Sequence, residues 1–427
     1  MTRTFTFKFD WLLLFILLVP TYYVWGMEMR QAQMLFFQDA AIFLLAFAHI
    51  NKYIGGFLFL ALVQTYITKN TDLQQTHLFN LFFGAIIYQF IVKFMNIEEI
   101  KKYWWAFCAL ILLNLAWCGL QHFQIDPIFQ MRDQQFQQTF TEYSGFFALP
   151  AFLGNYVAPL VPVCLSLNYF LVPAALLCLV ISKSSFSLAA AYFASLFYYW
   201  FRKRLVFWIL LIVGGAGLIF YAVKIDFPTG QFTRRLKVWK LVTRVALMKQ
   251  WIGYGLSNYR QFTVAEVTPT HEVLITNAKN VGGILGFVSD EANKYGKPEI
   301  VEFIKTRNKD NFNILELNQV MQKNGMDFHD WKPVHNDFLE VLFEMGIFGL
   351  LIVIGYLVDM FRRFWRYGRD NLPCLTMASA LVAIIVVTFG HFPFHIARLA
   401  GPYVVLLAIF EACLIRAQQS EELSLRL

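Results

Sequence analysis

The most constraining feature of this sequence is a series of about twelve apolar runs, each roughly 15 to 25 residues long. A helix rises about 1.5 Å per residue, so a run of this length reaches across the hydrocarbon core of a membrane. The strands of a membrane β-barrel would instead be about ten residues long and alternate in polarity. Because 58% of the residues are hydrophobic and only 15% are charged, the composition also lies outside that of soluble globular proteins. The sequence therefore predicts an all-α polytopic membrane protein.

The predicted membrane helices follow these runs along the chain. They cover residues 11–26, 34–50, 53–68, 77–95, 103–121, 146–167, 169–182, 184–201, 205–223, 336–361, 373–391 and 399–416. The runs between 146 and 201 are separated by only a few polar residues and contain several prolines, a pattern compatible with kinked or re-entrant segments.

One polar region, residues 225–334, is too long for a simple connection and predicts a loop domain between the ninth and tenth helices. The predicted organisation is therefore helices one to nine in 1–224, the loop domain in 225–334, and helices ten to twelve in 335–427. Within the loop domain the sequence predicts two polar helices, at 298–309 and 312–323, with Gly325 as a stop signal.

The distribution of Lys and Arg predicts the orientation of the chain. With the N-terminus in the cytoplasm, fifteen of these residues fall on the cytoplasmic side, and five fall in the short loops of the other side. Under the positive-inside rule, both termini are then cytoplasmic and the loop domain is extracytoplasmic.

The net charge of +8 is spread over short loops and one long loop. Without a compact basic domain, nucleic acid is excluded as a partner, and membrane lipids or phosphate groups are favoured. The six cysteines lie inside apolar runs and are expected to be core residues: Cys108, Cys118, Cys164, Cys178, Cys374 and Cys413. Since His271, His329 and His335 lack companions at metal-binding spacing, we expect no metal site, and we expect no cofactor.

The segment from Trp331 to Leu350 is the first candidate for a functional site. His335 directly precedes an apolar run and is expected where a membrane helix meets water, with Asn336 or Asp337 capping the first turn. A defined helix start fixes the position of His335, as a reactive group requires. Taken alone, however, the segment favours an ordinary interfacial histidine.

A basic segment opens the loop domain and forms the second candidate. It contains Arg235, and its cations Lys237, Lys240 and Arg244 recur at helical spacing. No acid lies between Phe227 and Ala265. The apolar side is predicted to lie on the bilayer and comprises Leu236, Val242, Val245 and Met248. A turn at Gly253-Tyr254-Gly255 ends the helix. Two interpretations remain open at this point, an interfacial anchor and a dedicated phosphate site.

Further cations fall on the same predicted side of the membrane as His335. Lys183 precedes Ser184 and Ser185 at one extracytoplasmic turn, and Arg398 follows His391 and His395 at another. The simplest interpretation of each turn is a solvated loop. However, several separate cations on the extracytoplasmic side of the membrane are harder to explain by chance.

Together these residues resemble the O-antigen ligase family of membrane glycan transferases, which is related to O-antigen polymerases and bacterial protein O-oligosaccharyltransferases. Arg235 with Trp239, followed by the Gly253–Gly255 turn, resembles the family's Arg-x-x-x-Trp segment and Gly-x-Gly turn. His335 and Asn336 with Leu339 resemble its His-Asn-x-x-Leu helix start. A dozen helices with one large extracytoplasmic loop before the tenth also resemble the family architecture.

The chain departs from the family pattern at one position. The family usually opens an earlier helix with a Ser-Arg pair, where this chain has Ser184 and Ser185. Lys183 stands one position earlier and is the candidate to replace that cation.

The resemblance implies a donor glycan on undecaprenyl diphosphate and an acceptor hydroxyl on lipid A-core or on a protein. It implies that His335 is the catalytic base and that Arg235 is the clamp for the leaving diphosphate. The other substrate-binding candidates are Arg398, Lys183, Arg244 and Asn336. Since the loop offers no carboxylate cage, we expect a metal-independent enzyme. The site would face the periplasm from the bacterial inner membrane.

Several alternatives stay open. Chain length and the moderate loop favour ligation to lipid A-core slightly over protein O-glycosylation or O-antigen polymerisation. A transporter or flippase for the lipid-linked glycan would have the same helical body without covalent chemistry, and it would carry ionisable residues near the midplane. Asp39 and Glu411 lie in apolar runs and have no role in the transferase interpretation.

Overall fold

The computed structural model describes most of residues 51–424. The segments outside this description are 1–50, 69–71, 124–142, 148, 222–230, 248–249, 257–258, 260–261, 269–271, 278–280, 307–313, 331–333, 392, 396 and 425–427. The predicted helices 11–26 and 34–50, with Asp39, therefore lie outside the described residues.

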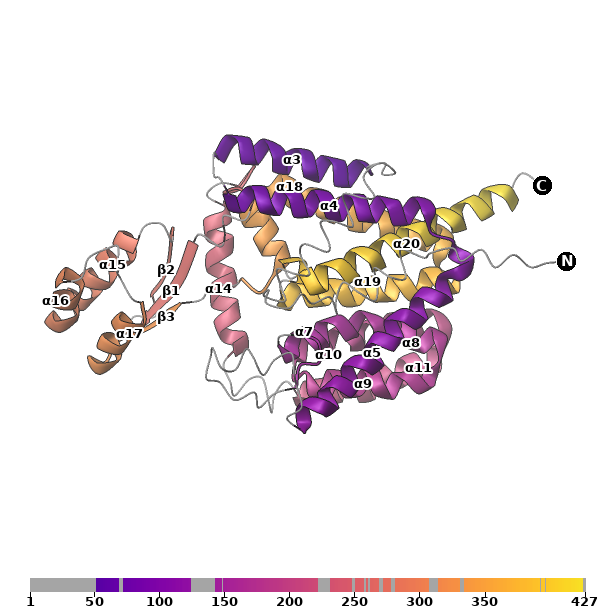
Figure 1. The fold of residues 1–427 in the computed structure, drawn as a ribbon, viewed down its shortest axis with the longest axis horizontal. Coiled ribbons are helices and arrows are strands. Elements are labelled where there is room, and N and C mark those ends of the chain that lie inside the picture. The colour runs from indigo at the N-terminus through magenta and orange to yellow at the C-terminus, as the bar shows by residue number, and fades with distance from the viewer. Residues whose placement is uncertain are drawn as a thin grey trace. The chain divides into compact units, whose positions relative to one another are not determined.

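The described chain is predominantly helical (Figure 1). Its α-helices are α3 (Lys52–Thr68), α4 (Asp72–Phe94), α5 (Ile100–His122), α7 (Pro150–Val157), α8 (Val161–Leu167), α9 (Val172–Ile181), α10 (Ser185–Arg202), α11 (Arg204–Ile209), α12 (Gly215–Tyr221), α14 (Gln231–Ala246), α15 (Val281–Lys294), α16 (Pro298–Thr306), α17 (Ile314–Lys323), α18 (Asp337–Arg363), α19 (Leu372–Gly390) and α20 (Ala397–Ser424). The strands are β1 (Phe262–Thr268), β2 (Glu272–Asn277) and β3 (Asp327–Asp330).

Within the described residues, five helical stretches are long and apolar enough to cross a membrane. These are Ile97–His122, Pro150–Leu167, Asp337–Gly368, Leu372–Gly390 and Leu399–Ser424. Shorter apolar helices follow other predicted runs, at Lys52–Gln64, Asn80–Phe94, Tyr169–Ile181 and Arg204–Gly217. The fold is thus compatible with a helical membrane protein.

The chain divides into two compact units. The helical unit contains Met1–Leu58, Phe79–Gly230 and Ile352–Leu427, and the mixed unit contains Phe59–Leu78 and Gln231–Leu351. This division differs from the predicted segments because the mixed unit includes the first part of α18 in addition to most of the polar region.

The core of the helical unit is built from closely packed helices. α10 packs along α19, and α19 packs along α20 (Figure 1). Alanines are buried on both α10 and α19, including Ala190, Ala194, Ala378 and Ala383. Such small side chains let membrane helices approach closely, which increases their van der Waals contact. Between α7 and α8, a 3-10 turn at Ala158–Leu160 contains Pro159, an interruption of the kind that the prolines predict.

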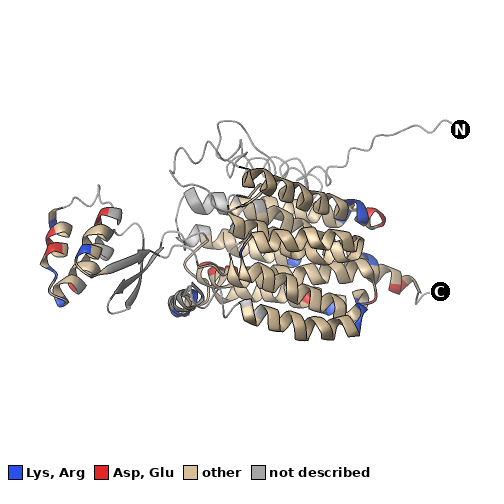
Figure 2. Ribbon diagram, turned by 90° about the horizontal axis from the view of Figure 1, so that it is seen from below, with Lys and Arg blue, Asp and Glu red and all other residues tan. Residues whose placement is uncertain are grey.

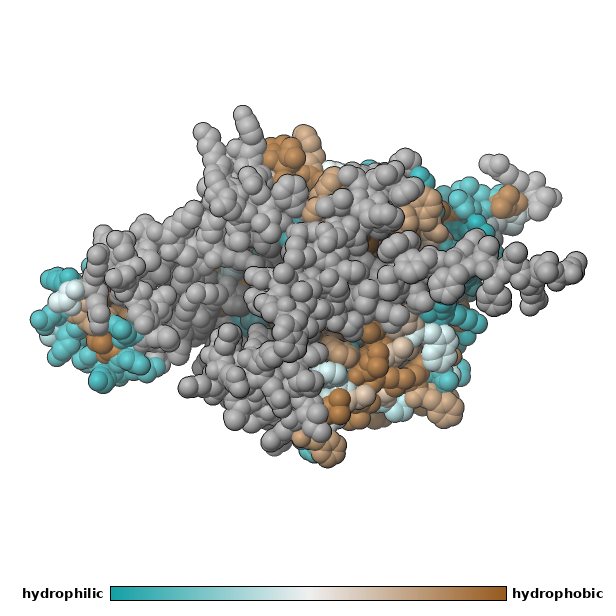
Figure 3. Space-filling view, in the orientation of Figure 1, coloured by the Kyte–Doolittle hydropathy of each residue, from teal (hydrophilic) through white to brown (hydrophobic). Residues whose placement is uncertain are grey.

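The outside of the helical unit carries apolar side chains. Figure 3 shows an apolar patch over α5 and α9. Leu113 on α5 and Val180 on α9 are 50% and 64% exposed, respectively. Exposed aliphatic side chains of this kind suit contact with lipid chains. The helical backbone beneath them needs no hydrogen-bond partner from the lipid, because its polar groups bond within the helix.

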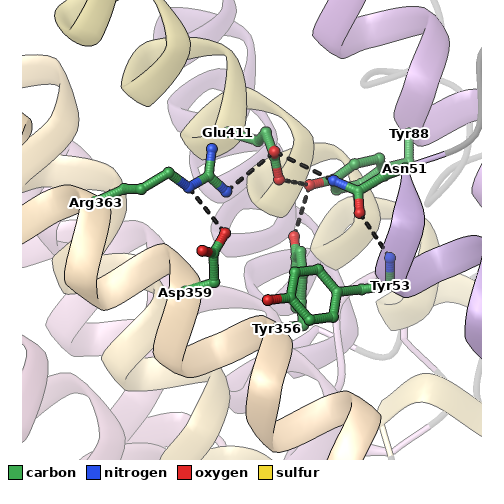
Figure 4. A network of polar contacts seen from close by, with 7 residues as sticks. All are labelled: Asn51, Tyr53, Tyr88, Tyr356, Asp359, Arg363 and Glu411. Atoms are coloured by element: carbon green, nitrogen blue, oxygen red, sulfur yellow. Dashed lines mark hydrogen bonds and ion pairs between the residues drawn. The ribbon is translucent and has the colours of Figure 1, made fainter.

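A polar network lies inside the helical unit and includes Glu411 (Figure 4). Its carboxylate accepts hydrogen bonds from Tyr88 (2.5 Å) and Asn51 (3.3 Å) and pairs with the Arg363 guanidinium at 3.1 Å. Arg363 also pairs with Asp359 at 3.0 Å. The network connects α4, α18 and α20, so the buried charge of Glu411 is compensated by partners on separate helices. This accounts for one of the two acids that the sequence left unexplained.

The mixed unit contains a small antiparallel sheet of order β2-β1-β3. In it, Ala265 of β1 lies opposite Leu274 of β2 on one side and Asp330 of β3 on the other. The all-helical prediction is therefore wrong in this region. β3 pairs with a strand about sixty residues earlier in the chain, and pairing over such a separation leaves little signal in either short segment.

Three helices, α15, α16 and α17, bury a separate apolar core in the mixed unit. It is formed by Leu285, Val288, Ala292, Ile300, Val301, Leu317, Met321 and Met326. α16 and α17 confirm the two helices predicted at 298–309 and 312–323, with somewhat shorter bounds. Gly325, with φ of +70°, follows α17 as the predicted stop.

Candidate functional site

The candidate site is built where α14 packs against the first part of α18. Val238, Val242 and Ala246 lie at successive turns of α14 and are buried against Leu342 and Phe343 of α18. The apolar side of α14 therefore packs on protein, and the prediction that it lies on the bilayer is wrong for Val242, which is fully buried. Leu236 is 46% exposed, whereas Val245 is partly buried in the same cluster, and Met248 lies outside the described residues. The sequence alone could not separate protein-facing from lipid-facing apolar residues.

Asn336 defines the start of α18. Its side-chain oxygen accepts a hydrogen bond from the backbone N–H of Leu339 at 3.0 Å, as expected of an N-cap. Asn336 is buried, and this hydrogen bond occupies its carboxamide oxygen. The contact with substrate that the resemblance implies would fall to its NH₂ group.

His335 precedes this cap and has a left-handed backbone, with φ of +53°. Few residues other than glycine adopt this conformation, and it costs about 1–3 kcal/mol unless the surroundings enforce it. The Trp239 indole N–H donates a hydrogen bond to the carbonyl of Val334 at 2.8 Å. Since Trp239 lies one helical turn after Arg235 on α14, this bond ties the helix of Arg235 to the residue directly before His335.

Arg235 and His335 interact electrostatically. Burial, followed by the positive charge of the Arg235 guanidinium, lowers the pKa of His335 from its ordinary 6.5 to about 4. The imidazole is therefore neutral at physiological pH, with a nitrogen lone pair that can accept a proton. A neutral base beside a fixed cation is an arrangement suited to reactions in which a hydroxyl loses a proton while negative charge develops nearby.

We expect a histidine-specific NMR titration to place the midpoint of His335 near pH 4. A His335→Asn variant would assign the signal by its loss. As pH falls from about 6.5 to 4, the unfolded chain takes up a proton at this position that the native state does not, so stability decreases in that window and is independent of His335 above it. A midpoint at or above 6.5 would contradict the proposed burial beside Arg235.

A break in α18 lies about three helical turns after His335. Gly346, with φ of +66° and ψ of −168°, interrupts the helix. The carbonyls of Phe343 and Glu344 accept hydrogen bonds from the N–H groups of Tyr254 and Gly255, both at 2.9 Å. On the other side of the break, the N–H groups of Ile347 and Phe348 donate to the carbonyls of Gln250 and Trp251 at 2.7 and 3.3 Å. We call the paired segments 250–255 and 343–348 the interlock.

The interlock requires glycine at two positions. A Cβ atom added to Gly253 would lie 2.6 Å from the backbone of Glu344 and from the nitrogen of Gly346. A Cβ atom added to Gly346 would overlap the backbone of Trp251. The predicted turn at Gly253-Tyr254-Gly255 therefore does more than end a helix. It satisfies the backbone groups that a broken helix would otherwise leave without partners.

Aromatic side chains and Gln64 reinforce the interlock. The Tyr254 ring stacks on that of Phe343, with centroids 4.7 Å apart, and Tyr259 meets the same ring edge-on at 5.3 Å. The Gln64 side chain donates a hydrogen bond to the carbonyl of Glu344 at 2.7 Å. The segment that follows α14 is thereby fixed to the helix that His335 precedes.

None of three buried carboxylates on α18 was among the site residues predicted from the sequence. Asp337, Glu340 and Glu344 are all less than 7% exposed, and their spacing of three and four residues places them along one face. Glu344 accepts a hydrogen bond from the backbone N–H of Tyr259 at 3.3 Å. The signal that could have revealed them is the recurrence of acids at helical spacing in an otherwise apolar run.

The other predicted site residues lie as follows. Arg244 is exposed on α14, in the same unit as His335. Lys183 belongs to the helical unit, is exposed, and has a left-handed φ of +49° in the turn between α9 and α10. Arg398 is in the first turn of α20, also in the helical unit, and its side chain is not described. A shared site for all of these cations with His335 stays a prediction.

The turn containing Lys183 is followed by buried polar side chains. The Ser184 hydroxyl accepts the backbone N–H of Ser187 at 3.3 Å and so caps α10. It lies 3.4 Å from Nε2 of His391, which follows α19. Where the family usually has a Ser-Arg pair, this chain thus has a capping serine that contacts a histidine, a partner that the sequence did not suggest.

In the part of the chain that the structure describes, no three His, Cys, Asp or Glu side chains come together as a metal site would require. The metal-independent mechanism nevertheless stays a prediction, because it concerns the reaction. In comparisons with known proteins, no family model matches this chain and no curated protein matches its sequence. The resemblance to O-antigen ligases accordingly rests on the residues quoted above.

Proposed function

We propose that this protein is a membrane glycosyltransferase that moves a glycan from undecaprenyl diphosphate to an acceptor hydroxyl. The observation that carries the proposal is the neutral His335 imidazole beside the Arg235 guanidinium, immediately before an apolar helix of membrane-spanning length. The acceptor we favour is lipid A-core, as in O-antigen ligation. The site faces the periplasm in a chain of about twelve spans in the bacterial inner membrane, with both termini in the cytoplasm.

The proposed reaction is a displacement at the anomeric carbon of the donor sugar. The acceptor hydroxyl attacks this carbon, His335 takes up its proton, and the bond between the carbon and the diphosphate oxygen breaks. The electron pair of that bond leaves with the diphosphate, whose added negative charge Arg235 stabilises. Guanidinium suits this role because it stays charged and can bind phosphate oxygens through two parallel hydrogen bonds.

The interlock and the Trp239 bond give the proposed pair its support. Arg235 lies on a helix, and His335 lies between the Trp239–Val334 bond and the Asn336 cap. Preorganised charge contributes to catalysis because it needs no rearrangement when the leaving group departs. Lys183, Arg398 and Arg244 are additional candidates for contact with the phosphates. We propose no metal in this mechanism.

A reconstituted assay tests the proposal and identifies the acceptor class. The full chain is placed in vesicles with a labelled glycan on undecaprenyl diphosphate, and lipid A-core, a pilin-like protein and a free glycan are offered separately. We expect labelled product with lipid A-core. Labelled product with the protein acceptor would support the glycan-transfer reaction but identify the protein as an O-glycosyltransferase. Labelled product with the free glycan would identify it as a polymerase. Failure with all three acceptors would oppose the transferase proposal.

A lipid-linked glycan transporter is the second candidate, and two observations favour it. α18 is broken at Gly346, and a buried ion-pair network surrounds Glu411. Discontinuous helices and buried ionisable groups are both common in transporters. In the vesicle assay, a transporter would move the labelled lipid across the bilayer while the glycan stays attached to its diphosphate.

Arg235→Lys should reduce glycan transfer about tenfold to a hundredfold, since losing one charge-assisted hydrogen bond costs about 1.5–3 kcal/mol. A lysine keeps the charge but cannot reproduce the guanidinium fork. Lys240→Gln is a matched control, because Lys240 is an exposed cation on the same helix and is expected to leave the rate unchanged. Equal losses in both variants would indicate a general effect of charge on α14 instead of a specific clamp.

A further inference from the structure

Two separate elements of the helical unit bring cations together at one end of the helices. α10 ends at Arg202, Lys203 forms the corner, and α11 begins at Arg204. Arg362 and Arg366 lie one turn apart at the end of α18 and in the π-helical segment Phe364–Gly368 that follows. All five side chains are exposed. Figure 2 shows Lys and Arg gathered at the end of the helical unit where the C-terminus lies.

Aromatic contacts join the two elements. The centroid of the Phe201 ring lies 5.6 Å from the ring centroids of both Phe364 and Trp365. The end of α10 therefore packs directly on the segment that carries Arg366. The Arg204 guanidinium lies over the Trp200 ring, 3.9 Å from its centroid, and Arg366 lies 5.0 Å from the ring centroid of Tyr367. Stacking of this kind restrains the guanidinium groups and leaves their N–H groups available. We call Arg202, Lys203, Arg204, Arg362 and Arg366 the corner cluster.

Among the residues that the structure describes, acidic side chains do not neutralise the corner cluster. The sequence from Val172 to Lys224 contains no Asp or Glu. Near the end of α18, Asp359 pairs with Arg363 at 3.0 Å, and Asp370 pairs with Arg369 at 3.2 Å. Among the described residues, no carboxylate lies within 4.0 Å of a cation of the cluster. Within the described part of the chain, the five positive charges of the cluster are therefore available to an external partner.

Exposed apolar side chains adjoin the same cations. Leu205 and Trp208 on α11 are 74% and 53% exposed, and Trp365 is 57% exposed. A partner that covers this corner must present negative charge next to hydrocarbon. A phospholipid has this form, whereas a soluble anion would leave the tryptophans and Leu205 uncovered.

We propose that the corner cluster is a binding site for a phospholipid that carries two phosphates, of the cardiolipin type. The cations of the α10–α11 corner would take one phosphate, and Arg362 with Arg366 the other, while the acyl chains lie over Leu205, Trp208 and Trp365. A lipid with one phosphate can satisfy only one of the two groups. The site is independent of the proposed transferase chemistry, because it belongs to the helical unit and uses none of the candidate catalytic residues.

The site can be tested on the full chain by native mass spectrometry in detergent, with cardiolipin and phosphatidylglycerol added at equal phosphate concentration. We expect one cardiolipin to be retained at least about tenfold more tightly than phosphatidylglycerol. The triple variant Arg202→Gln, Lys203→Gln and Arg204→Gln should lose this preference. A second variant, Arg362→Gln with Arg366→Gln, should lose it independently, so the test does not depend on the folding of one protein.

The control is the triple variant Lys93→Gln, Lys101→Gln and Lys102→Gln. It removes as many charges from the ends of α4 and α5, away from the corner cluster in sequence, and should keep the cardiolipin preference. Equal binding of both lipids by the wild type would overturn the proposal. So would an equal loss in the control, because both results would mean that only general attraction between the basic end of the protein and anionic lipid operates.

Discussion

Gly346→Ala is expected to destabilise the mixed unit by about 3 kcal/mol or more and to lower the thermal midpoint of the full chain accordingly. Two costs combine at this position. The backbone at φ of +66° and ψ of −168° lies in a region that essentially only glycine adopts, and a side chain there costs about 1–3 kcal/mol. In addition, the new methyl group would overlap the backbone of Trp251, and relief of that overlap would lengthen the hydrogen bonds of the interlock.

Two other glycines of the same unit separate these costs. Gly325 also has a positive φ, of +70°, but a Cβ atom there would meet nothing within 4 Å, so Gly325→Ala should cost only about 1 kcal/mol. Gly286 lies inside α15 with open space around it, and Gly286→Ala should be neutral or stabilising by up to about 1 kcal/mol. Thermal unfolding of the three variants in one detergent gives the comparison. A Gly346→Ala protein no less stable than Gly325→Ala would show that the close approach in the interlock is unimportant.

His335→Asn should reduce glycan transfer about a hundredfold to ten-thousandfold, the usual contribution of a positioned base, while leaving insertion and thermal stability nearly unchanged. Asparagine removes the imidazole but tolerates the left-handed backbone that this position has at φ of +53°, so loss of activity would not follow from misfolding. His122→Asn serves as the histidine control, because His122 is exposed and lies at the end of α5. Both variants should be recovered from membranes in the same yield as the wild type.

The sequence was sufficient to predict the long helices because apolar runs of membrane-spanning length have few alternatives. The predicted helix at 336–361 corresponds to α18 at Asp337–Arg363, and that at 373–391 corresponds to α19 at Leu372–Gly390. The cap at Asn336 was also predictable, since a polar residue before an apolar run has a local function.

The break in α18 could not be predicted from its own sequence. The run around Gly346 is apolar on both sides, and only the docking of residues 250–255, about ninety positions earlier, makes the break favourable. The sheet depends on β1 and β3 meeting across a comparable separation. Glu411 likewise looked unexplained because its partners, Tyr88 and Arg363, are brought to it by tertiary packing.

The candidate site shows the same division between local and tertiary information. Arg235 and His335 were chosen from separate motifs a hundred residues apart, and the structure places them close enough to interact. The bond from Trp239 to Val334 explains how that proximity is held. Lys183 and Arg398 belong to the helical unit, whereas Arg235 and His335 belong to the mixed unit.

The central claim is that His335 and Arg235 form a site that breaks the bond between a glycan and its lipid diphosphate. The most direct measurement is mass-spectrometric analysis of donor and product in vesicles that contain either the wild type or His335→Asn at equal amounts. The account predicts that the wild type releases one undecaprenyl diphosphate for each glycan joined to the acceptor, and that the variant leaves the donor intact. Equal product from both proteins, or donor that crosses the bilayer with its glycan still attached, would contradict it.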